Sequence, residues 1–154
     1  MSITISKESP LHPDLSVLFA RHTADMHADT PPESIHMMDA GALDVPAVFF
    51  YVLRLEGAPV SMGAFKRIEN GHAEIKSMHV LHEHRGQGLS RLMLDHLLAA
   101  ARTEGIARLS LETGAQDMFR PARILYERAG FTECPPFGDY VLDPNSIFMT
   151  RTLA

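Results

Sequence analysis

The 154-residue chain is poor in cysteine and in positive charge, and these two shortages restrict the compartment and the class of partner that we expect for it. Its one cysteine, Cys134, has no partner for an intramolecular disulfide, so we expect a reducing, cytoplasmic compartment. The 14 Lys and Arg residues are outnumbered by 19 Asp and Glu, which gives a formal net charge of −5. Since a nucleic-acid-binding protein usually carries a basic face, we expect no nucleic-acid partner.

Long apolar runs and metal-ligand spacings are also missing. No run approaches the ~18 apolar residues that a transmembrane helix needs, and the start lacks the pattern of a secretory signal peptide. We therefore expect neither a membrane span nor a leader. His79, His82 and His84 straddle a strand end and a loop, and no H-E-x-x-H pattern occurs, so no metal site is predicted.

The length fits one domain, residues 1–154, and the 45% apolar and 21% charged residues are those of an ordinary globular protein. Hydrophobic periodicity predicts an α/β (α+β) architecture with a mixed, mostly antiparallel sheet of about seven strands and about four helices. The expected strands are Ser2–Ser6, Ala47–Leu55, Val60–Arg67, Ala73–Val80, Arg108–Thr113, Phe131–Cys134 and Ser146–Leu153. The expected helices are one capped by Asp14, then Ser34–Leu43, Leu89–Thr103 and Met118–Arg128.

Two glycines flanked by arginines lie between the strand Ala73–Val80 and the helix that begins at Leu89. Glycine lets backbone N–H groups approach a ligand closely, and a helix start adds unpaired donors and the positive end of the dipole. The segment Arg85-Gly86-Gln87-Gly88-Leu89-Ser90-Arg91 therefore predicts a cradle for a phosphate-bearing ligand. No lysine follows either glycine, which excludes a P-loop, and the third glycine of a dinucleotide fingerprint is absent.

The cradle resembles the signature of the GCN5-related N-acetyltransferases (GNAT), which reads Arg/Gln-x-x-Gly-x-Gly/Ala. Here it reads Arg85 to Ser90, with serine in place of the last glycine or alanine. Downstream, Ala122 to Phe131 is similar to the family's A-x-x-L-Y-x-x-x-G-F. Four further segments, 32–36, 74–78, 109–114 and 143–146, resemble an uncharacterised bacterial branch, the YsnE-type acetyltransferases. The resemblance extends from the first strand to the last and implies the GNAT fold, with a central parallel strand pair splayed at the acetyl-CoA site.

That resemblance implies transfer of an acetyl group from acetyl-CoA to a primary amine by direct attack in a ternary complex. The acceptor is left open between a small amine, an amino acid and a protein N-terminus, with the first two favoured over the third, and dimers are common in the family. The Met78 N–H is the expected donor to the thioester oxygen. The residues implied in cofactor binding are Met78, His79, Val80, Arg85, Gly86, Gln87, Gly88, Leu89, Ser90, Arg91 and Tyr126.

Three residues are candidates for proton transfer. Tyr126 can give a proton to the departing thiolate, because a phenol has a pKa of about 10 and a thiol of about 8.5. Its other interpretation is a tyrosine packed on an apolar helix face. Glu112 is the first candidate for the general base and Glu74 the second, and the alternative for either is a surface carboxylate or an ion pair.

The family's acceptor site corresponds to two segments of this chain. They contain the candidate substrate-binding residues Glu33, Ser34, His36, Tyr140 and Asn145. A helix start and a turn would account for the same residues. Phe119 stands where many members carry an asparagine that contacts the cofactor.

A non-catalytic acyl-CoA-binding sensor or interaction module on the same fold is the alternative function. The presence of both Tyr126 and Glu112 argues against it. An acyl-carrying nucleophile at Cys134 is also disfavoured, because that cysteine lies on a late short strand without a paired base.

Overall fold

Seven strands form one mixed sheet in the computed structural model, which describes residues 2–153. The spatial order is β1-β2-β3-β4-β5-β7-β6, and β4–β5 is the one parallel pair among these neighbours. The strands are β1 (Ile3–Lys7), β2 (Val48–Leu55), β3 (Ala58–Glu69), β4 (His72–Val80), β5 (Arg108–Gly114), β6 (Thr132–Glu133) and β7 (Ser146–Thr152). The predicted mixed, mostly antiparallel sheet is confirmed.

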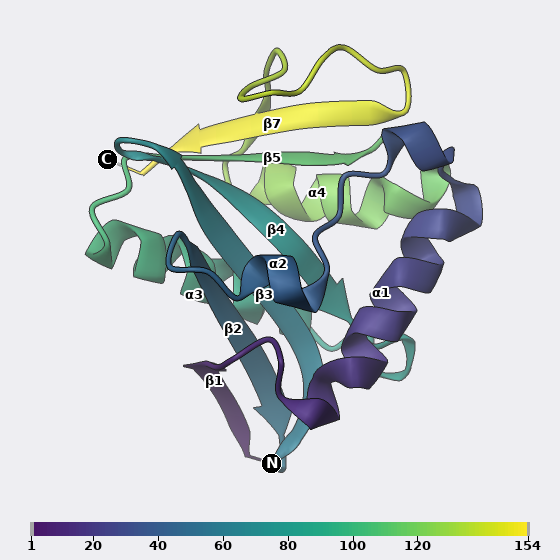
Figure 1. Cartoon of the computed structure of the whole chain (residues 1–154), viewed down its shortest axis with the longest axis vertical. Coiled ribbons are helices and arrows are strands. Elements are labelled where there is room, and N and C mark those ends of the chain that lie inside the picture. Colours follow the sequence, from purple (N-terminus) through teal and green to yellow (C-terminus); the bar gives the residue numbers. More distant parts are fainter. Residues whose placement is uncertain (1, 154) are drawn as a thin grey trace.

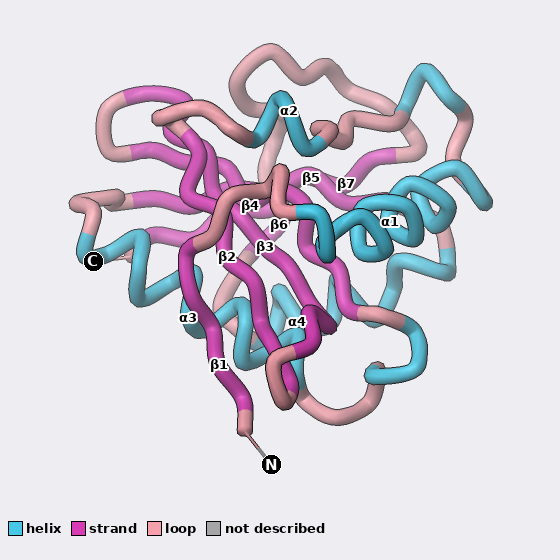
Figure 2. Tube along the Cα trace, turned by 60° about the horizontal axis from the view of Figure 1, so that its bottom comes forward, coloured by secondary structure: helices cyan, strands magenta, loops and turns pink. Residues whose placement is uncertain are grey.

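Helices cover both faces of the sheet. The α-helices are α1 (Ser16–Asp29), α2 (Ala40–Leu43), α3 (Leu89–Thr103) and α4 (Arg120–Arg128). Short 3-10 helices are η1 (Pro13–Leu15), η2 (Pro32–Ser34), η3 (His82–His84) and η4 (Asp117–Phe119). In Figure 1 α1 and α2 lie in front of the sheet, and α3 and α4 lie behind it. Figure 2 shows the same layers from another side.

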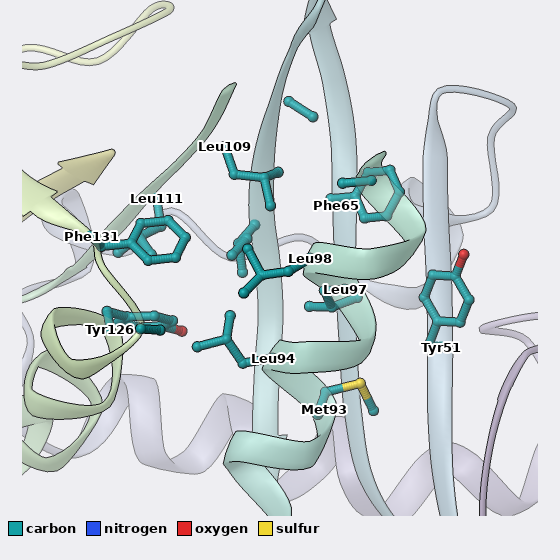
Figure 3. Packing of buried hydrophobic residues seen from close by; sticks show 14 of the residues in the cluster. Tyr51, Phe65, Met93, Leu94, Leu97, Leu98, Leu109, Leu111, Tyr126 and Phe131 are labelled. Atoms are coloured by element: carbon teal, nitrogen blue, oxygen red, sulfur yellow. The ribbon is translucent and has the colours of Figure 1, made fainter. Parts of the chain in front are cut away.

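The core has two parts, one on each face of the sheet. On α3, Leu89, Met93 and Leu97 recur every four residues, so they form one stripe, and this stripe packs on the strands. Figure 3 shows Met93 and Leu97 of α3 on the side of the helix that faces the strands, with Tyr126 of α4 beside this helix. The opposite face is filled by Leu15, Leu18, Leu43, Val48, Phe50, Val52, Met62, Ala64 and Leu81.

The parallel strands β4 and β5 separate partway along their length. Their register pairs end at Glu74 and Ser110, although β4 continues to Val80 and β5 to Gly114. This gap confirms the predicted splay of the central pair. It also leaves the sheet open at the point where β4 runs into the cradle.

A β-bulge in β4 sets which side chains face the gap. Gly63 of β3 lies opposite both Ser77 and Met78, and Ser77 has a left-handed φ of 59°. The extra residue shifts the alternation, so that Met78 packs on the α3 side and His79 points to the α1 side. One inserted residue therefore determines the lining on both sides of the gap.

Three local predictions from the sequence are wrong. Ser34–Leu43 is not one helix: η2 and α2 flank an extended stretch in which the His36 carbonyl accepts a hydrogen bond from Lys76 at 2.8 Å. A continuous helix would have used that carbonyl in its own ladder. Asp14 does not cap α1, because its carboxylate pairs with Arg54 at 2.7 Å. The helix expected from Met118 begins at Arg120, after η4.

Gly63 provides a test of the packing around the bulge. A Cβ at this position would lie 2.8 Å from Met78 Sδ and 2.9 Å from Met93 Cγ, so one of these side chains must move. We expect Gly63→Ala to lower the free energy of unfolding by about 1–3 kcal/mol, the usual cost of overpacking a core. Urea denaturation at equilibrium measures it.

Gly41→Ala is the matched control. Gly41 lies in α2, and a Cβ there would approach Asp39 Oδ1 no closer than 3.6 Å. Because alanine favours a helix over glycine, this variant should be neutral or slightly stabilised. Equal destabilisation of both variants would contradict the role assigned to Gly63.

Candidate active site

The gap between β4 and β5 opens into a cavity of about 500 Å³. Its walls come from α1, the extended stretch after η2, the end of β4, the cradle, β5 and the start of α4. The lining includes residues from both faces of the sheet, such as His22 on the α1 side and Tyr126 on the α4 side. The cavity therefore connects the two faces through the parted strands.

The cradle forms one end of this cavity. Gly86 and Gly88 have φ of 79° and 78°, in the left-handed region that favours glycine, and a Cβ on either would meet nothing within 4 Å. Gly88 caps α3 without a side-chain hydrogen bond. None of the backbone N–H groups of residues 86–91 donates to another residue within 2–153. These donors and the N-terminus of a 15-residue helix suit an anionic group.

The two arginines of the cradle are engaged with other residues. Arg85 donates to Asp25 of α1 at 2.8 Å and to the Val80 carbonyl at 3.1 Å, and Arg91 donates to Asp95 at 2.9 Å. Both still line the cavity, whereas Gln87 is exposed and does not. The unpaired donors of the cradle are thus backbone N–H groups rather than free guanidinium groups.

Beside the bulge, His79 packs against His22 of α1. Their ring centroids are 5.2 Å apart, and His79 Nδ1 lies 3.9 Å from Asp25 Oδ2. Burial lowers the pKa of both imidazoles to about 4, so both are neutral at neutral pH. The Nε2 atom of His79 is buried and has no hydrogen-bond partner in the described part of the chain.

The two candidate bases differ in their partners. Tyr140 donates to Glu74 Oε2 at 2.5 Å and Lys76 lies 3.4 Å from the same atom. Glu112, half-buried in the cavity wall, forms no ion pair within residues 2–153, and its carboxylate has a hydroxyl donor in Ser146. Burial raises the pKa of the Glu112 carboxyl. Glu112 is therefore the better proton acceptor.

Tyr126 of α4 lines the same cavity as the two carboxylates. Its side chain is buried and its ring lies 5.7 Å from that of Phe131, edge to face. Burial raises the pKa of the phenol above its ordinary value, so the hydroxyl stays protonated. The hydroxyl makes no hydrogen bond to any other residue in the described range, which leaves its proton free for a ligand.

The structure separates the five expected acceptor residues into three groups. His36 lines the cavity, and Tyr140 reaches its edge through Glu74. Ser34 and Asn145 instead form a clip with Asp143, in which the Ser34 hydroxyl donates to Asp143 Oδ2 at 2.6 Å. Glu33 is exposed and lies outside the cavity lining.

Several lining residues were missed by sequence reasoning. They are His22, Asp25, Met26, Met37 and Lys76. Strand alternation could have placed Lys76 on the face of Glu74, and the 22, 25, 26 spacing marks one face of α1. Nothing in the sequence links these residues to the cradle, because that depends on how α1 packs on β4.

Phe119 replaces the family's asparagine and contributes an apolar wall. Its ring lies against the backbone of Gly114, where a Cβ would sit 2.1 Å from Phe119 Cδ2. Gly114 ends β5, so this contact joins η4 to the strand that carries Glu112. The asparagine contact that the resemblance implies has no counterpart at position 119.

The side-chain clusters and helices of residues 2–153 also bear on metal binding and membrane spanning. Among residues 2–153, no group of three or more His, Cys, Asp or Glu side chains is placed to hold a metal ion. Within the same range, no helix has the length and apolar character needed to cross a bilayer.

Comparison with known proteins agrees with this geometry. Residues 15–131 match the acetyltransferase (GNAT) family. The uncharacterised N-acetyltransferase YsnE of Bacillus subtilis (strain 168) is 41% identical over 136 residues, which cover 88% of this chain and 90% of YsnE. YedL of Escherichia coli (strain K12), also an uncharacterised N-acetyltransferase, is 38% identical and covers 97% of this chain and 94% of YedL.

A solved structure extends the likeness to the fold. A candidate acyl-CoA N-acyltransferase from Klebsiella pneumoniae has a TM-score of 0.80 and 29% identity, covering 99% of this chain and 98% of that one. The resemblance drawn from Arg85 to Ser90 and from Ala122 to Phe131 is thereby confirmed. The chain belongs to the acetyltransferase (GNAT) family and is an acyltransferase with that family's acyl-CoA-binding fold.

Proposed function

We propose that this protein transfers an acetyl group from acetyl-CoA to a primary amine of a small molecule or amino acid. One observation carries the proposal: a single cavity has unpaired backbone N–H donors at one end and, in its wall, the half-buried carboxylate of Glu112, whose pKa burial raises. The donors suit the pyrophosphate, and the carboxylate suits an amine. Donor and acceptor would meet in the gap between β4 and β5, as direct attack requires.

The residues present fit coenzyme A. Gly86 and Gly88 leave open space where a Cβ would stand, and the N–H groups from Gly86 to Arg91 are available to phosphate oxygens. Met78 lies within the bulge, and we assign its backbone N–H as the hydrogen-bond donor to the thioester oxygen. When bound, acetyl-CoA supplies an acetyl group activated as a thioester.

Within this cavity we assign Glu112 as the general base and Tyr126 as the general acid. Glu112 would take a proton from the acceptor ammonium, directly or through water, since burial raises its pKa and the Ser146 hydroxyl is its only side-chain donor. Tyr126 would hold a proton at its hydroxyl for the leaving thiolate, because burial keeps the phenol protonated. Tyr140 and Lys76 hold the Glu74 carboxylate in place, and Glu74 would orient the acceptor amine.

The alternative is an acyl-CoA sensor without turnover. A sensor needs the cradle but has no use for a carboxylate with a raised pKa in the same cavity as a protonated tyrosine. We favour the enzyme for that reason. A cytoplasmic location is part of the proposal, since Cys134 is a free thiol.

The cradle can be tested by placing a negative charge in it. Gly88→Glu should weaken binding of coenzyme A by at least about tenfold, because the new carboxylate repels the pyrophosphate. The left-handed φ of 78° should also cost about 1 kcal/mol of stability. Isothermal calorimetry and urea denaturation measure the two effects.

Gly105→Glu is the matched control, because Gly105 follows α3 at its other end with the same φ of 78° and open space. It should lose similar stability but bind coenzyme A normally. Unchanged binding in Gly88→Glu, or equal loss in both variants, would remove the cradle assignment.

The assignment of the base predicts a pH dependence. Glu112 must be ionised to accept a proton, so kcat/KM should fall as pH drops through its pKa, which burial places above the usual 4.5. Glu112→Gln should lower kcat about 100-fold and abolish this acidic limb. Glu74→Gln should keep the limb; if that variant loses the limb instead, Glu74 is the base.

Removing the Tyr126 hydroxyl separates enzyme from sensor. Tyr126→Phe keeps the ring that packs on Phe131, so the fold and the affinity for coenzyme A should be unchanged. If Tyr126 is the general acid, kcat should fall about 100-fold with butylamine or phenethylamine as acceptor. A wild-type protein that binds acetyl-CoA but releases no coenzyme A with either amine would favour the sensor.

A further inference from the structure

The one ammonium group on the acceptor side of the described cavity has no donor left for a ligand. Lys76 Nζ lies 2.8 Å from the His36 carbonyl, 3.2 Å from the Tyr140 hydroxyl and 3.4 Å from Glu74 Oε2. A lysine ammonium has three N–H donors, and these three contacts use all of them. Its side chain is only 11% exposed, so it is held in place.

Carboxylate oxygens, by contrast, remain available in the same region. Glu74 gives only Oε2 to Tyr140 and Lys76, so its Oε1 accepts no hydrogen bond from residues 2–153, although the side chain is 91% buried. Glu112 has only the Ser146 hydroxyl as a side-chain donor, so its oxygens can accept further hydrogen bonds as well. Two carboxylates thus share the charge of one lysine, and the excess is negative.

The other charged or titratable groups of this wall do not offset that excess. Asp25 is paired with Arg85 at 2.8 Å. His22 and His79 are neutral, because burial lowers the pKa of each to about 4. His36 lies edge-on to the Tyr140 ring at 5.0 Å. Met26 and Met37 supply the apolar lining.

We infer that the acceptor is a primary amine with no carboxylate next to its nitrogen, so that free α-amino acids are rejected. The inference rests on the proposed function and narrows its acceptor. An ammonium group brings N–H donors to the free oxygens of Glu74 and Glu112, and its apolar remainder lies against Met26 and Met37. An α-carboxylate would lie among carboxylates with no donor from Lys76 to receive it.

Two sets of three matched acceptors test this. The sets are butylamine, norvalinamide and norvaline, and phenethylamine, phenylalaninamide and phenylalanine. Within a set the side chain is constant, and the amide keeps the bulk of the carboxylate without its charge. Release of coenzyme A from acetyl-CoA is followed at roughly pH 8.5, where ordinary imidazoles are neutral, with rates expressed per ammonium form of the acceptor. We expect kcat/KM for the two amino acids to be at least about tenfold below that of their amides.

Variants identify the source of the discrimination. Glu74→Gln removes one negative charge and loosens Lys76. The difference in kcat/KM between amide and acid should therefore shrink to about threefold or less. Met37→Leu is the matched control: it changes the apolar lining of the same wall without altering charge or the contacts of Lys76, and the difference between amide and acid should remain. Circular dichroism and acetyl-CoA affinity establish that both variants are folded.

The outcomes separate this inference from the proposed function. If amines and amides are acetylated and the amino acids equally well, the inference fails while the acetyltransferase stands. If the difference in kcat/KM between amide and acid persists in Glu74→Gln, the excess negative charge is not its cause and the inference fails as well. If no acceptor releases coenzyme A from a protein that binds acetyl-CoA, the proposed function fails first and takes the inference with it.

Discussion

The parting of β4 and β5 is the constraint on which the rest of this structure depends. Two parallel strands that share register only as far as Glu74 and Ser110 must leave backbone and side chains unpaired beyond that point. In most sheets such a gap would be costly, because buried polar groups need partners. Here the bulge at Ser77, the close packing at Gly63 and the start of α3 hold the gap open, and it joins the two faces of the sheet.

Hydrogen-bond partners, rather than residue type, decide how charge is used around this gap. Arg85 belongs to the family signature, yet its guanidinium is paired with Asp25 and the free donors are backbone N–H groups. Glu74 and Glu112 are chemically alike, but Tyr140 and Lys76 hold only Glu74. A carboxylate that accepts hydrogen bonds from a phenol and an ammonium is a weaker base than a buried one with a single hydroxyl donor. This difference supports Glu112 as the base and Glu74 as part of the acceptor's surroundings.

The sequence was sufficient for the sheet, the parallel pair and the cradle because each has a short-range signal. Alternation marks β4 and β5, and the paired glycines mark the strand-to-helix turn before α3. The prediction of one helix from Ser34 to Leu43 was wrong because the conformation of this stretch depends on a long-range hydrogen bond from Lys76 to the His36 carbonyl. The same limit applies to the acceptor side: Ser34 and Asn145 look polar and available in the sequence, but the fold uses them to clip a loop.

The two departures from the family pattern have different consequences. Ser90 contributes to the cradle through its backbone N–H, which is free whatever small side chain the residue carries, so the substitution leaves the anion site intact. Phe119 is different, because an apolar ring cannot supply the hydrogen bonds of an asparagine amide. Its ring lies against Gly114 so closely that any larger residue there would have to displace it. Gly114 and Phe119 therefore form one structural unit. This unit adds an apolar wall beside β5, the strand that carries Glu112.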